Sequence, residues 1–478
     1  MTMWFDELEV TSPLEAFGAL PDWLAAGMDG DSVRESLQRQ VPELVERSWQ
    51  IVSCTPELLR AQGEEWLVRY RFEVVGNLWR PQNAPARPAV DGVFWDEQWH
   101  CRLPELGIEL RVAVSDEALP ALDEIVEPRA VARLLQTVVR DAGYVDAVVV
   151  SCRPDVVRYK PGSRCTVVVG LTYEGSAGEP PPNPVVIKTH QGDKGQTAWA
   201  AMTALWQTPL ARNSTPMIAE PLAYLPQRRI LVQGPVPEDR TLEELARTAI
   251  SDASSSAIDE LRTELAKTGR ALAALHMSRA TYGRTATVEE ELADVVEVVD
   301  RLATSVSALH AAAAPLLARL HRLSADFAAG PTVSAHHDFR PVQVLLHQGD
   351  VGFIDFDGTC MAEPALDLGR FRAKLRDIGI SVLAARGEPL HGRPLAEHLA
   401  LMDDVCDHFL DAYLQEAPVS RDRVLLCEIC DLFTAMLHAW IKVRLARLEP
   451  RLTVLRHRLS GVRFSDPHAA HEIQPVAR

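Results

Sequence analysis

The stretch HHDFRPVQVLLHQGDVGFIDFDG, residues 336–358, carries the pattern that decides the fold. Two apolar runs, VQVLL and VGFI, are separated by the polar segment HQGD, which predicts a hairpin of two short strands. Asp338 lies in the loop before the first run, Gln343 at its start, and Asp355 directly after the second. Because a hairpin brings its outer ends together, we expect these three side chains to lie close to one another.

Two carboxylates and an amide oxygen form a donor set that suits Mg²⁺, which also takes water and phosphate oxygens as ligands. Asp357 is either a further metal contact or a turn residue before the glycine that follows it. Phosphoryl transfer requires such ligands, a carboxylate base and a lysine on the phosphates. Lys188, at the end of the strand-like run VVIK, is either that lysine or a solvated residue of an edge strand.

The bulk composition narrows the classes of function. A chain of 478 residues suggests two or three domains, and its 47% hydrophobic and 24% charged residues are typical of a globular protein. A net charge of −17 argues against nucleic-acid and anionic-membrane partners. No apolar run approaches about 20 residues, and the acidic N-terminus resembles no secretory signal, so we expect a cytoplasmic protein. The eight cysteines are too sparse for a disulfide framework.

The chain divides into three predicted parts, which together give an α+β fold class. Residues 1–125 mix helical and strand-like patterns and form a candidate N-terminal cap domain. Residues 126–236 begin with a helix and are then rich in strands, and residues 237–478 are mainly helical. The segment VQGPVPEDRT joins the last two parts as a hinge. Active sites often occupy the junction of two lobes, so we expect Gln233 and Val236 to contact a bound cofactor.

An ordered set of motifs resembles the aminoglycoside phosphotransferase/choline kinase superfamily. These motifs are VVIK, GRALAALH (residues 269–276), the opening stretch, and EPALDLGRF, and they cover roughly residues 145–460. The resemblance implies a bilobal, protein-kinase-like fold with a β-rich nucleotide lobe and an α-rich lobe. It also implies an enzyme that uses ATP and Mg²⁺ to phosphorylate a hydroxyl group of a small molecule.

The resemblance assigns roles to individual residues. Asp338 corresponds to the catalytic base, and His336, two residues earlier, to the histidine that braces its loop. Asp355 corresponds to the principal Mg²⁺ ligand and Lys188 to the lysine on the α- and β-phosphates. Asp367 corresponds to an aspartate that supports the catalytic loop.

Two departures point to one branch of the superfamily. Gln343 stands where asparagine is usual, and VQVLL is similar to the corresponding run of maltokinases, which also carry an N-terminal cap domain. The glycine-rich phosphate loop is replaced by RYKPGSRCTVV, which also resembles maltokinase-like relatives. There Lys160 and Arg164 either supply positive charge to the phosphates or form an exposed basic hairpin tip.

A third departure concerns Lys188. In this superfamily the lysine pairs with a glutamate on the following helix, but GDKGQTAWAAMTALW contains none. The nearest polar candidates are Asp193 and Gln196, with Glu220 further along the chain. Alternatively, the phosphates alone hold the lysine.

The acceptor is less constrained by the sequence. Asp403, Asp407 and Asp411 are spaced to share one helical face, either as a solvated surface or as an acidic rim for a cationic substrate. In HAWIKVRLARL, Trp440 is either a core residue or a platform for a sugar ring, near Lys442 and Arg444.

We therefore expect an ATP- and Mg²⁺-dependent phosphotransferase acting on a sugar, aminosugar or aminocyclitol, including aminoglycoside-like compounds. Its partners would be ATP and this small polyhydroxylated substrate. The alternatives are a pseudokinase that binds nucleotide without transferring phosphate, and a structural or interaction protein. The last would leave the ordered motifs unexplained.

Overall fold

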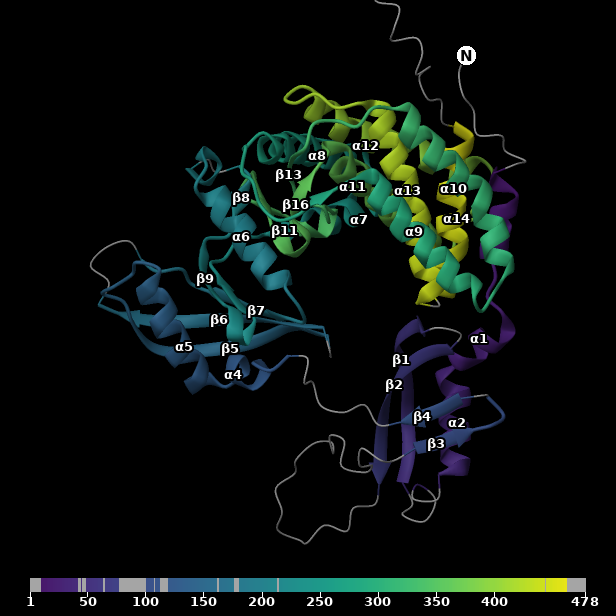
Figure 1. The fold of residues 1–478 in the computed structure, drawn as a ribbon, viewed down its shortest axis with the longest axis horizontal. Helices are drawn as coiled ribbons and strands as arrows, with labels where there is room; N and C mark the ends of the chain where they lie inside the picture. The colour runs from purple at the N-terminus through teal and green to yellow at the C-terminus, as the bar shows by residue number, and fades with distance from the viewer. Residues whose placement is uncertain are drawn as a thin grey trace, which may run out of the picture.

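The computed structural model describes residues 10–41, 44, 49–62, 65–76, 100–106, 108–111, 119–160, 163–175, 180–212, 215–442 and 444–461. Figure 1 shows a β-rich lobe beside a large helical lobe, with a smaller mixed unit built from the N-terminal part of the chain. The predicted α+β class and the order of β-rich lobe before α-rich lobe are confirmed.

The mixed unit falls within the predicted cap region. It contains helix α2 and two antiparallel strand pairs, β1–β2 and β3–β4. Their bounds are α2 (Gly30–Gln40), β1 (Trp49–Gln62), β2 (Glu65–Gly76), β3 (His100–Leu103) and β4 (Ile108–Arg111). The unit has a small core of its own, in which Val33, Leu37, Ile51 and Leu103 are almost completely buried.

The β-rich lobe is a five-stranded antiparallel sheet in the order β5-β6-β7-β10-β9. The strands are β5 (Val148–Lys160), β6 (Arg164–Glu174), β7 (Val185–His190), β9 (Pro221–Leu225) and β10 (Ile230–Gln233). Helices α4 (Leu122–Val126) and α5 (Pro128–Asp141) supply the rest of this core. Pro128 opens α5, and the Glu127 carboxylate accepts hydrogen bonds from the backbone N–H groups of Arg129 and Ala130.

Helix α6 (Lys194–Trp206) and the short strand β8 (Met217–Ile218) connect the two lobes. Helix α6 contacts β7, β9 and β10 of the β-rich lobe, and it also contacts the turn that carries Asp355. Strand β8 joins a second sheet, of order β11-β14-β15-β8, in the helical lobe. Helix α6 and strand β8 thus link the β-rich lobe to the part of the helical lobe that contains the hairpin.

The helical lobe contains the largest core of the protein. Its helices are α7 (Leu242–Asp252), α8 (Ser255–His276), α9 (Val288–Ala303), α10 (Ala308–Asp326), α11 (Pro364–Ala385), α12 (Gly392–Leu414), α13 (Arg421–Ile441) and α14 (Leu445–Gly461). Short strands β11 (Arg240–Thr241), β12 (Thr285–Ala286), β13 (Val333–Ala335) and β16 (Cys360–Ala362) complete it. Helices α11 and α13 pack so closely that a Cβ on Gly369 would lie 2.6 Å from the Glu428 backbone nitrogen.

The first described residues pack into the helical lobe. The short helix η2 (Pro13–Phe17) contacts α10 and α14, and α1 (Asp22–Gly27) follows it. In Figure 1 η2 lies beside the C-terminal helices, whereas α1 leads to the mixed unit, where the Tyr70 hydroxyl of β2 donates to the Gly27 carbonyl. Leu14 and Phe17 are fully buried in the same core as α13.

The predicted hairpin is present. Strand β14 (Val344–His347) pairs antiparallel with β15 (Asp350–Phe353). A short helix, η5 (Pro341–Gln343), precedes β14, and η6 (Phe356–Gly358) follows β15. The backbone N–H of Ile354 donates to the Gln343 carbonyl at 3.1 Å, which joins the two outer ends.

Helix α13 is the one described helix that is long and apolar enough to cross a membrane. Because 78% of its apolar stretch is buried inside the protein, the core of the helical lobe accounts for this composition.

Candidate active site

The pairing of β6 with β7 places two cationic side chains and a histidine, Lys188, Arg164 and His190, on one face of the sheet. Arg164 lies directly opposite His190 in the antiparallel register. Lys188 is two residues before His190, so its side chain emerges on the same face. Sequence reasoning identified Lys188 and Arg164 but missed His190, although the strand alternation of VVIKTH places it beside Lys188.

These three side chains contact the carboxylates of Asp355, which precedes η6, and Asp357, which lies within it. Lys188 Nζ lies 3.3 Å from Asp355 Oδ1 and 3.9 Å from Asp357 Oδ1. Arg164 Nη1 lies 3.7 and 3.9 Å from the same two carboxylates, and His190 Nε2 lies 2.8 Å from Asp357 Oδ2. Burial by itself would raise the pKa of Asp355, but Lys188 and then Arg164 hold that pKa well below its usual range. Both lobes therefore contribute to one compact charge cluster.

The donor set beside this cluster fits a hard cation. Asp355 adopts a left-handed backbone conformation, with φ +71°, that turns the chain at the end of β15. Asp357 Oδ1 and Gln343 Oε1 are buried and accept no hydrogen bond from the described residues, while Asp357 Oδ2 faces His190. The described residues hold no group of three or more His, Cys, Asp or Glu side chains that could bind a metal, and the donor set here consists of two carboxylates and an amide. Oxygen atoms of this kind are the ligands that Mg²⁺ takes.

Asp338 is linked to this donor set through Gln343. Its Oδ2 accepts hydrogen bonds from Gln343 Nε2 at 3.2 Å and from Arg340 Nη2 at 2.6 Å. The Asp338 side chain is 43% exposed, far more than the carboxylates of η6. Among the described residues both hydrogen bonds to this carboxylate go to Oδ2, so Oδ1 keeps its lone pairs for an incoming donor.

His336 ties the Asp338 loop to the end of β15. Its Nε2–H donates to the carbonyl of Ile354, the residue before Asp355, at 2.9 Å. The ring also packs against Phe339 and Phe356, with centroid distances of 5.5 and 5.0 Å. These contacts set the spacing between the two loops of the site.

Asp367 supports the same loop through hydrogen bonds to its backbone. Its buried carboxylate accepts the backbone N–H groups of His336 and His337, both at 2.7 Å. His276 Nε2 lies 3.2 Å from the same carboxylate, and its Nδ1 lies 2.9 Å from the Tyr413 hydroxyl. Burial acts to raise the pKa of Asp367, but the hydrogen bond with His276 and the charge of the neighbouring histidines lower it to about 2.

A second ionic network beside Asp338 was not predicted from the sequence. His337 has a left-handed backbone, φ +63°, and its Nε2 lies 3.1 Å from Glu291 Oε1. Arg370 pairs with Glu291 and with Asp431, both at 2.9 Å, and donates to the His337 carbonyl. Burial favours neutral His337, but hydrogen bonds to Cys360 and Glu291 raise its pKa to about 10. No local motif marks this network, because its members come from four separate elements.

Three predicted nucleotide contacts lie outside the charge cluster. Lys160 is exposed at the end of β5, and Gln233 is buried in β10, opposite Val186 of β7. Val236 packs against Gly352 of β15, where a Cβ would collide with it. The segment 233–236 thus leads from the sheet of the β-rich lobe to the sheet of the helical lobe.

The partners of Lys188 in the structure are not the residues suggested from the sequence. Lys188 pairs with the two carboxylates of η6, and none of Asp193, Gln196 and Glu220 forms an ion pair with it among the described residues. Glu220 instead accepts the Tyr144 hydroxyl at 2.9 Å. The helix glutamate expected in this superfamily is replaced here by direct pairing across the lobes.

The carboxylates of α12 lie on a largely solvated face rather than on an open acidic rim, since the side chains of Asp407 and Asp411 are 55% and 54% exposed. Each is paired with an arginine: Asp403 at 2.7 Å, Asp407 at 3.0 Å, and Asp411 in a short contact. The arginine partners are, in order, Arg376, Arg372 and Arg421. The three carboxylates share one face of α12, as their spacing predicted. Their ion pairs with arginines link α12 to neighbouring segments.

Trp440 is a core residue. Its side chain is 1% exposed, and its Nε1–H donates to the Phe17 carbonyl at 3.1 Å. The alternative in which it stacks on a sugar ring is therefore wrong. Cys427 and Cys430 are buried in the same helix, and all eight cysteines are free thiols.

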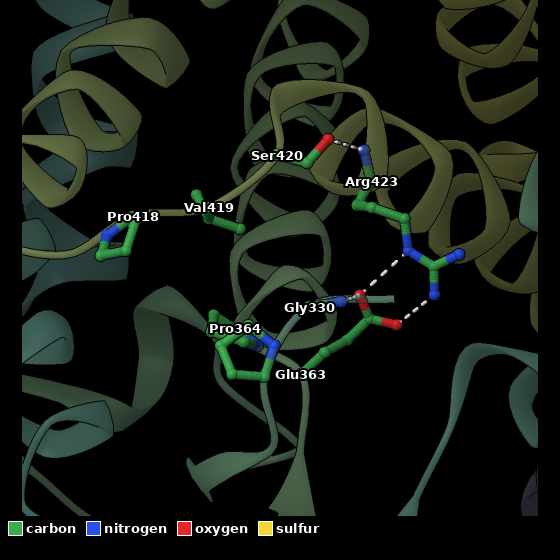
Figure 2. Close-up of a pocket in the computed structure, with 8 residues that line it drawn as sticks. Gly330, Glu363, Pro364, Pro418, Val419, Ser420 and Arg423 are labelled. Atoms are coloured by element: carbon green, nitrogen blue, oxygen red, sulfur yellow. Dashed lines mark hydrogen bonds and ion pairs between the residues drawn. The ribbon is translucent and has the colours of Figure 1, made fainter. Parts of the chain in front are cut away.

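Two cavities are lined by residues that do not include Asp338. One, of about 240 Å³, is lined by Gly330, Pro364, Val419 and a buried pair formed by Glu363 and Arg423 (Figure 2). Arg423 Nε donates to Glu363 at 2.9 Å and Nη1 donates to backbone carbonyls, so this pair is satisfied within the protein. Another, of about 660 Å³, lies between α5 and β9.

Comparisons with known proteins agree with the geometry. Residues 210–396, which contain Asp338, Gln343 and Asp355, match the Phosphotransferase enzyme family (APH). Similar solved structures include a choline/ethanolamine kinase family protein from Mesorhizobium loti, with 14% identity, 60% of this chain and 89% of that chain covered, and TM-score 0.39. A glucosamine kinase has 18% identity, coverage of 90% and 97%, and TM-score 0.46. A choline kinase from Streptococcus pneumoniae has 13% identity, coverage of 69% and 99%, and TM-score 0.43.

No curated protein matches the chain. The matched segment begins before β8 and ends within α12, so it includes the whole hairpin and both loops of the site. Residues 210–396 are therefore similar to the phosphotransferase enzyme family, and this similarity covers less than half of the chain.

Proposed function

We propose that the protein transfers the terminal phosphoryl group of ATP to a hydroxyl group of a small polyhydroxylated molecule, with Mg²⁺ as cofactor. One observation carries this proposal. Asp338, an accessible carboxylate, accepts a hydrogen bond from Gln343, which lies beside two buried carboxylates that face Lys188, Arg164 and His190 from the other lobe. A base, a cation site and phosphate-binding charges thereby lie together, as phosphoryl transfer requires.

The nucleotide end of the site consists of Lys188, Arg164 and His190. Their positive charges would neutralise the phosphates, and Arg164 can in addition form two parallel hydrogen bonds to one phosphate. Asp355, Asp357 and Gln343 would hold Mg²⁺, which when bound neutralises the charge that develops on the phosphates. We further propose that Lys160, Gln233 and Val236 line the rest of the nucleotide site.

The acceptor end of the site is Asp338. Its free Oδ1 would accept the proton of the acceptor hydroxyl, while Oδ2 is fixed by Arg340 and Gln343. His336 and Asp367 hold the loop that carries Asp338, so the carboxylate is positioned before the acceptor arrives. A sugar, aminosugar or aminocyclitol supplies the required hydroxyl groups, and the cytoplasm supplies ATP.

The decisive variant is Asp338→Asn, which keeps the shape of the side chain and removes its basicity. We expect turnover of ATP with an acceptor to fall about 10²- to 10⁴-fold, while Mg²⁺–ATP still raises the melting temperature as in the wild type. Asp326→Asn, at the exposed end of α10, is the matched control.

Two results would contradict the proposal. Unchanged turnover in Asp338→Asn would reject the role of this carboxylate. Stabilisation of the wild type by Mg²⁺–ATP without phosphate transfer to any hydroxyl compound would instead favour a pseudokinase, the alternative motivated by the missing helix glutamate.

A further inference from the structure

Helices α11 and α14 each carry two cationic side chains at helical spacing, and Lys442 and Arg444 lie in the link between α13 and α14. On α11, Arg370, Lys374 and Asp377 are spaced i, i+4 and i+7, which places them on one face. Helices α11, α13 and α14 pack against one another, and the faces concerned are joined by ion pairs. We call this surface the basic face; its cations are Arg370, Lys374, Lys442, Arg444, Arg447 and Arg451.

The carboxylates of this region are already paired. Arg370 binds both Glu291 and Asp431 at 2.9 Å. Arg451 binds both oxygens of Asp377 at 2.6 Å, in the bidentate geometry that is strongest for this pair. Two arginines therefore neutralise most of the negative charge that lies next to the basic face.

The remaining cations are left in excess. No carboxylate of the described residues forms an ion pair with Lys442, Arg444 or Arg447. Burial and the positive charges of Arg444 and then Lys160 lower the pKa of Lys442. Burial and Lys442 likewise lower the pKa of His438 to about 4. The basic face thus carries an unbalanced positive potential, in a chain whose net charge is −17.

The basic face borders the acceptor side of the site. Arg370 donates to the carbonyl of His337, the residue before Asp338, which places this end of the basic face beside the loop of the site. Lys374 lies one turn further along α11, 3.6 Å from Asp431. From the β-rich lobe, Lys160 is close enough to affect Lys442. An acceptor with a hydroxyl at Asp338 would extend towards these cations.

We propose that the acceptor carries an anionic group, a phosphate or a carboxylate, in addition to the hydroxyl that is phosphorylated. This inference rests on the proposed function and names the substrate class within it: sugar phosphates or sugar acids. Lys374, Lys442 and Arg447 bind the anion, while Asp338 receives the hydroxyl. A cationic aminosugar would be repelled by the same surface, because the α12 carboxylates that could have attracted it are paired with arginines.

The test compares matched ligands that differ in charge. Binding of glucose, glucosamine, glucuronate and glucose 6-phosphate is measured by calorimetry with ADP and Mg²⁺ saturating, so that the nucleotide phosphates already occupy their own site. Phosphate transfer from ATP to the same four compounds is measured in parallel. We expect the two anionic compounds to bind at least tenfold more tightly than glucose and to be the better acceptors.

The double variant Lys374→Gln/Lys442→Gln should weaken binding of the anionic compounds about tenfold for each cation removed and leave the KM for ATP unchanged. The variant Lys374→Arg/Lys442→Arg should restore binding. Arg393→Gln, which removes an exposed charge on α12, is the matched control and should bind as the wild type does.

The outcomes separate this inference from the proposed function. Transfer to glucose or glucosamine but not to the anionic compounds would overturn the inference and leave the function standing. Equal binding of all four compounds, or anion binding that survives the double variant, would also overturn it. Anion binding without transfer to any hydroxyl compound would reject the proposed function, and the acceptor assignment with it.

Discussion

Lys188 Nζ and Asp355 Oδ1 lie 3.3 Å apart, although 167 positions of sequence separate the two residues. The pair joins a strand of the β-rich lobe to the end of β15 in the helical lobe. With Arg164, His190 and Asp357 it forms a cluster in which cations and carboxylates balance one another. A ligand that brings charge of only one sign would disturb this balance, whereas Mg²⁺ and ATP together bring both signs.

We therefore predict that Mg²⁺ and ATP bind with strong positive cooperativity. Mg²⁺ alone is repelled by Lys188 and Arg164, and ATP alone is repelled by Asp355 and Asp357. Thermal denaturation with each ligand alone and with both should show a shift for the pair that exceeds the sum of the single shifts. ADP with Mg²⁺ provides a second ligand pair for the same comparison. Additive shifts would show that the cluster does not couple the two sites.

Shortening Gln343 should uncouple the base from the metal site. Gln343→Asn loses one methylene, about 1.5 Å of reach, so its amide cannot serve both Asp338 and a bound cation. We expect the Mg²⁺ concentration for half-maximal turnover to rise about tenfold, with a smaller change in the KM for ATP. Gln415→Asn, at the exposed end of α12, controls for the substitution itself. A Mg²⁺ dependence identical to that of the wild type would argue against Gln343 as a ligand.

The pairing of His337 with Glu291 predicts an alkaline limb in the stability profile. The folded-state pKa of His337 is raised to about 10 by Cys360 and Glu291, against burial, which acts in the opposite direction. A raised pKa means that the stabilisation is fully present below about pH 6.5 and is lost as the pH rises through about 10. Melting temperatures of the wild type and of His337→Gly, measured from pH 6 to pH 10, should therefore converge as the pH rises.

The same variant tests the backbone of the loop. Glycine adopts φ +63° without the cost of about 1 kcal/mol that a side chain adds, so His337→Gly should fold and should lose only the ion pair. His337→Asn, which also tolerates this conformation, is the conservative companion. A constant difference between wild type and both variants across this pH range would show that the imidazolium does not stabilise the fold.

Truncating Phe17 should destabilise the helical lobe. Its ring is fully buried, 5.9 Å from Phe433 and 6.5 Å from Trp440 in edge-to-face arrangements. We expect Phe17→Ala to cost about 3–5 kcal/mol, measured by urea denaturation. Met277→Ala, at a side chain that is 55% exposed, should change stability by less than about 0.5 kcal/mol. Equal stability of the two variants would show that η2 does not belong to this core.

The parts of the site that follow from local pattern were predicted from the sequence. The apolar runs around HQGD give the hairpin, and the hairpin brings Gln343 next to Asp355. The strand VVIK places Lys188 where an ammonium group can leave the sheet. His190 follows from the same alternation, but it is informative only once Asp357 is known to face it.

Other contacts depend on how distant elements pack, and no local spacing encodes them. Glu291 stands in a run of glutamates on α9 and gives no sign that Arg370 and His337 will surround it. The face shared by Asp403, Asp407 and Asp411 was visible as helical spacing. Its arginine partners lie elsewhere in the helical lobe, so the spacing alone did not reveal that the carboxylates of this largely exposed face are held in ion pairs.

The contact between Trp440 and Phe17 joins residues 423 positions apart, so Phe17 is synthesised long before the residue it contacts. At 5–20 residues per second, Phe17 leaves the ribosome about 20 to 85 s before its partner. During that interval the mixed unit and the β-rich lobe can fold, but η2 has no completed surface to bury its ring. The core of the helical lobe is therefore completed only after α13 has emerged, and until then the Phe17 ring lacks its Trp440 partner.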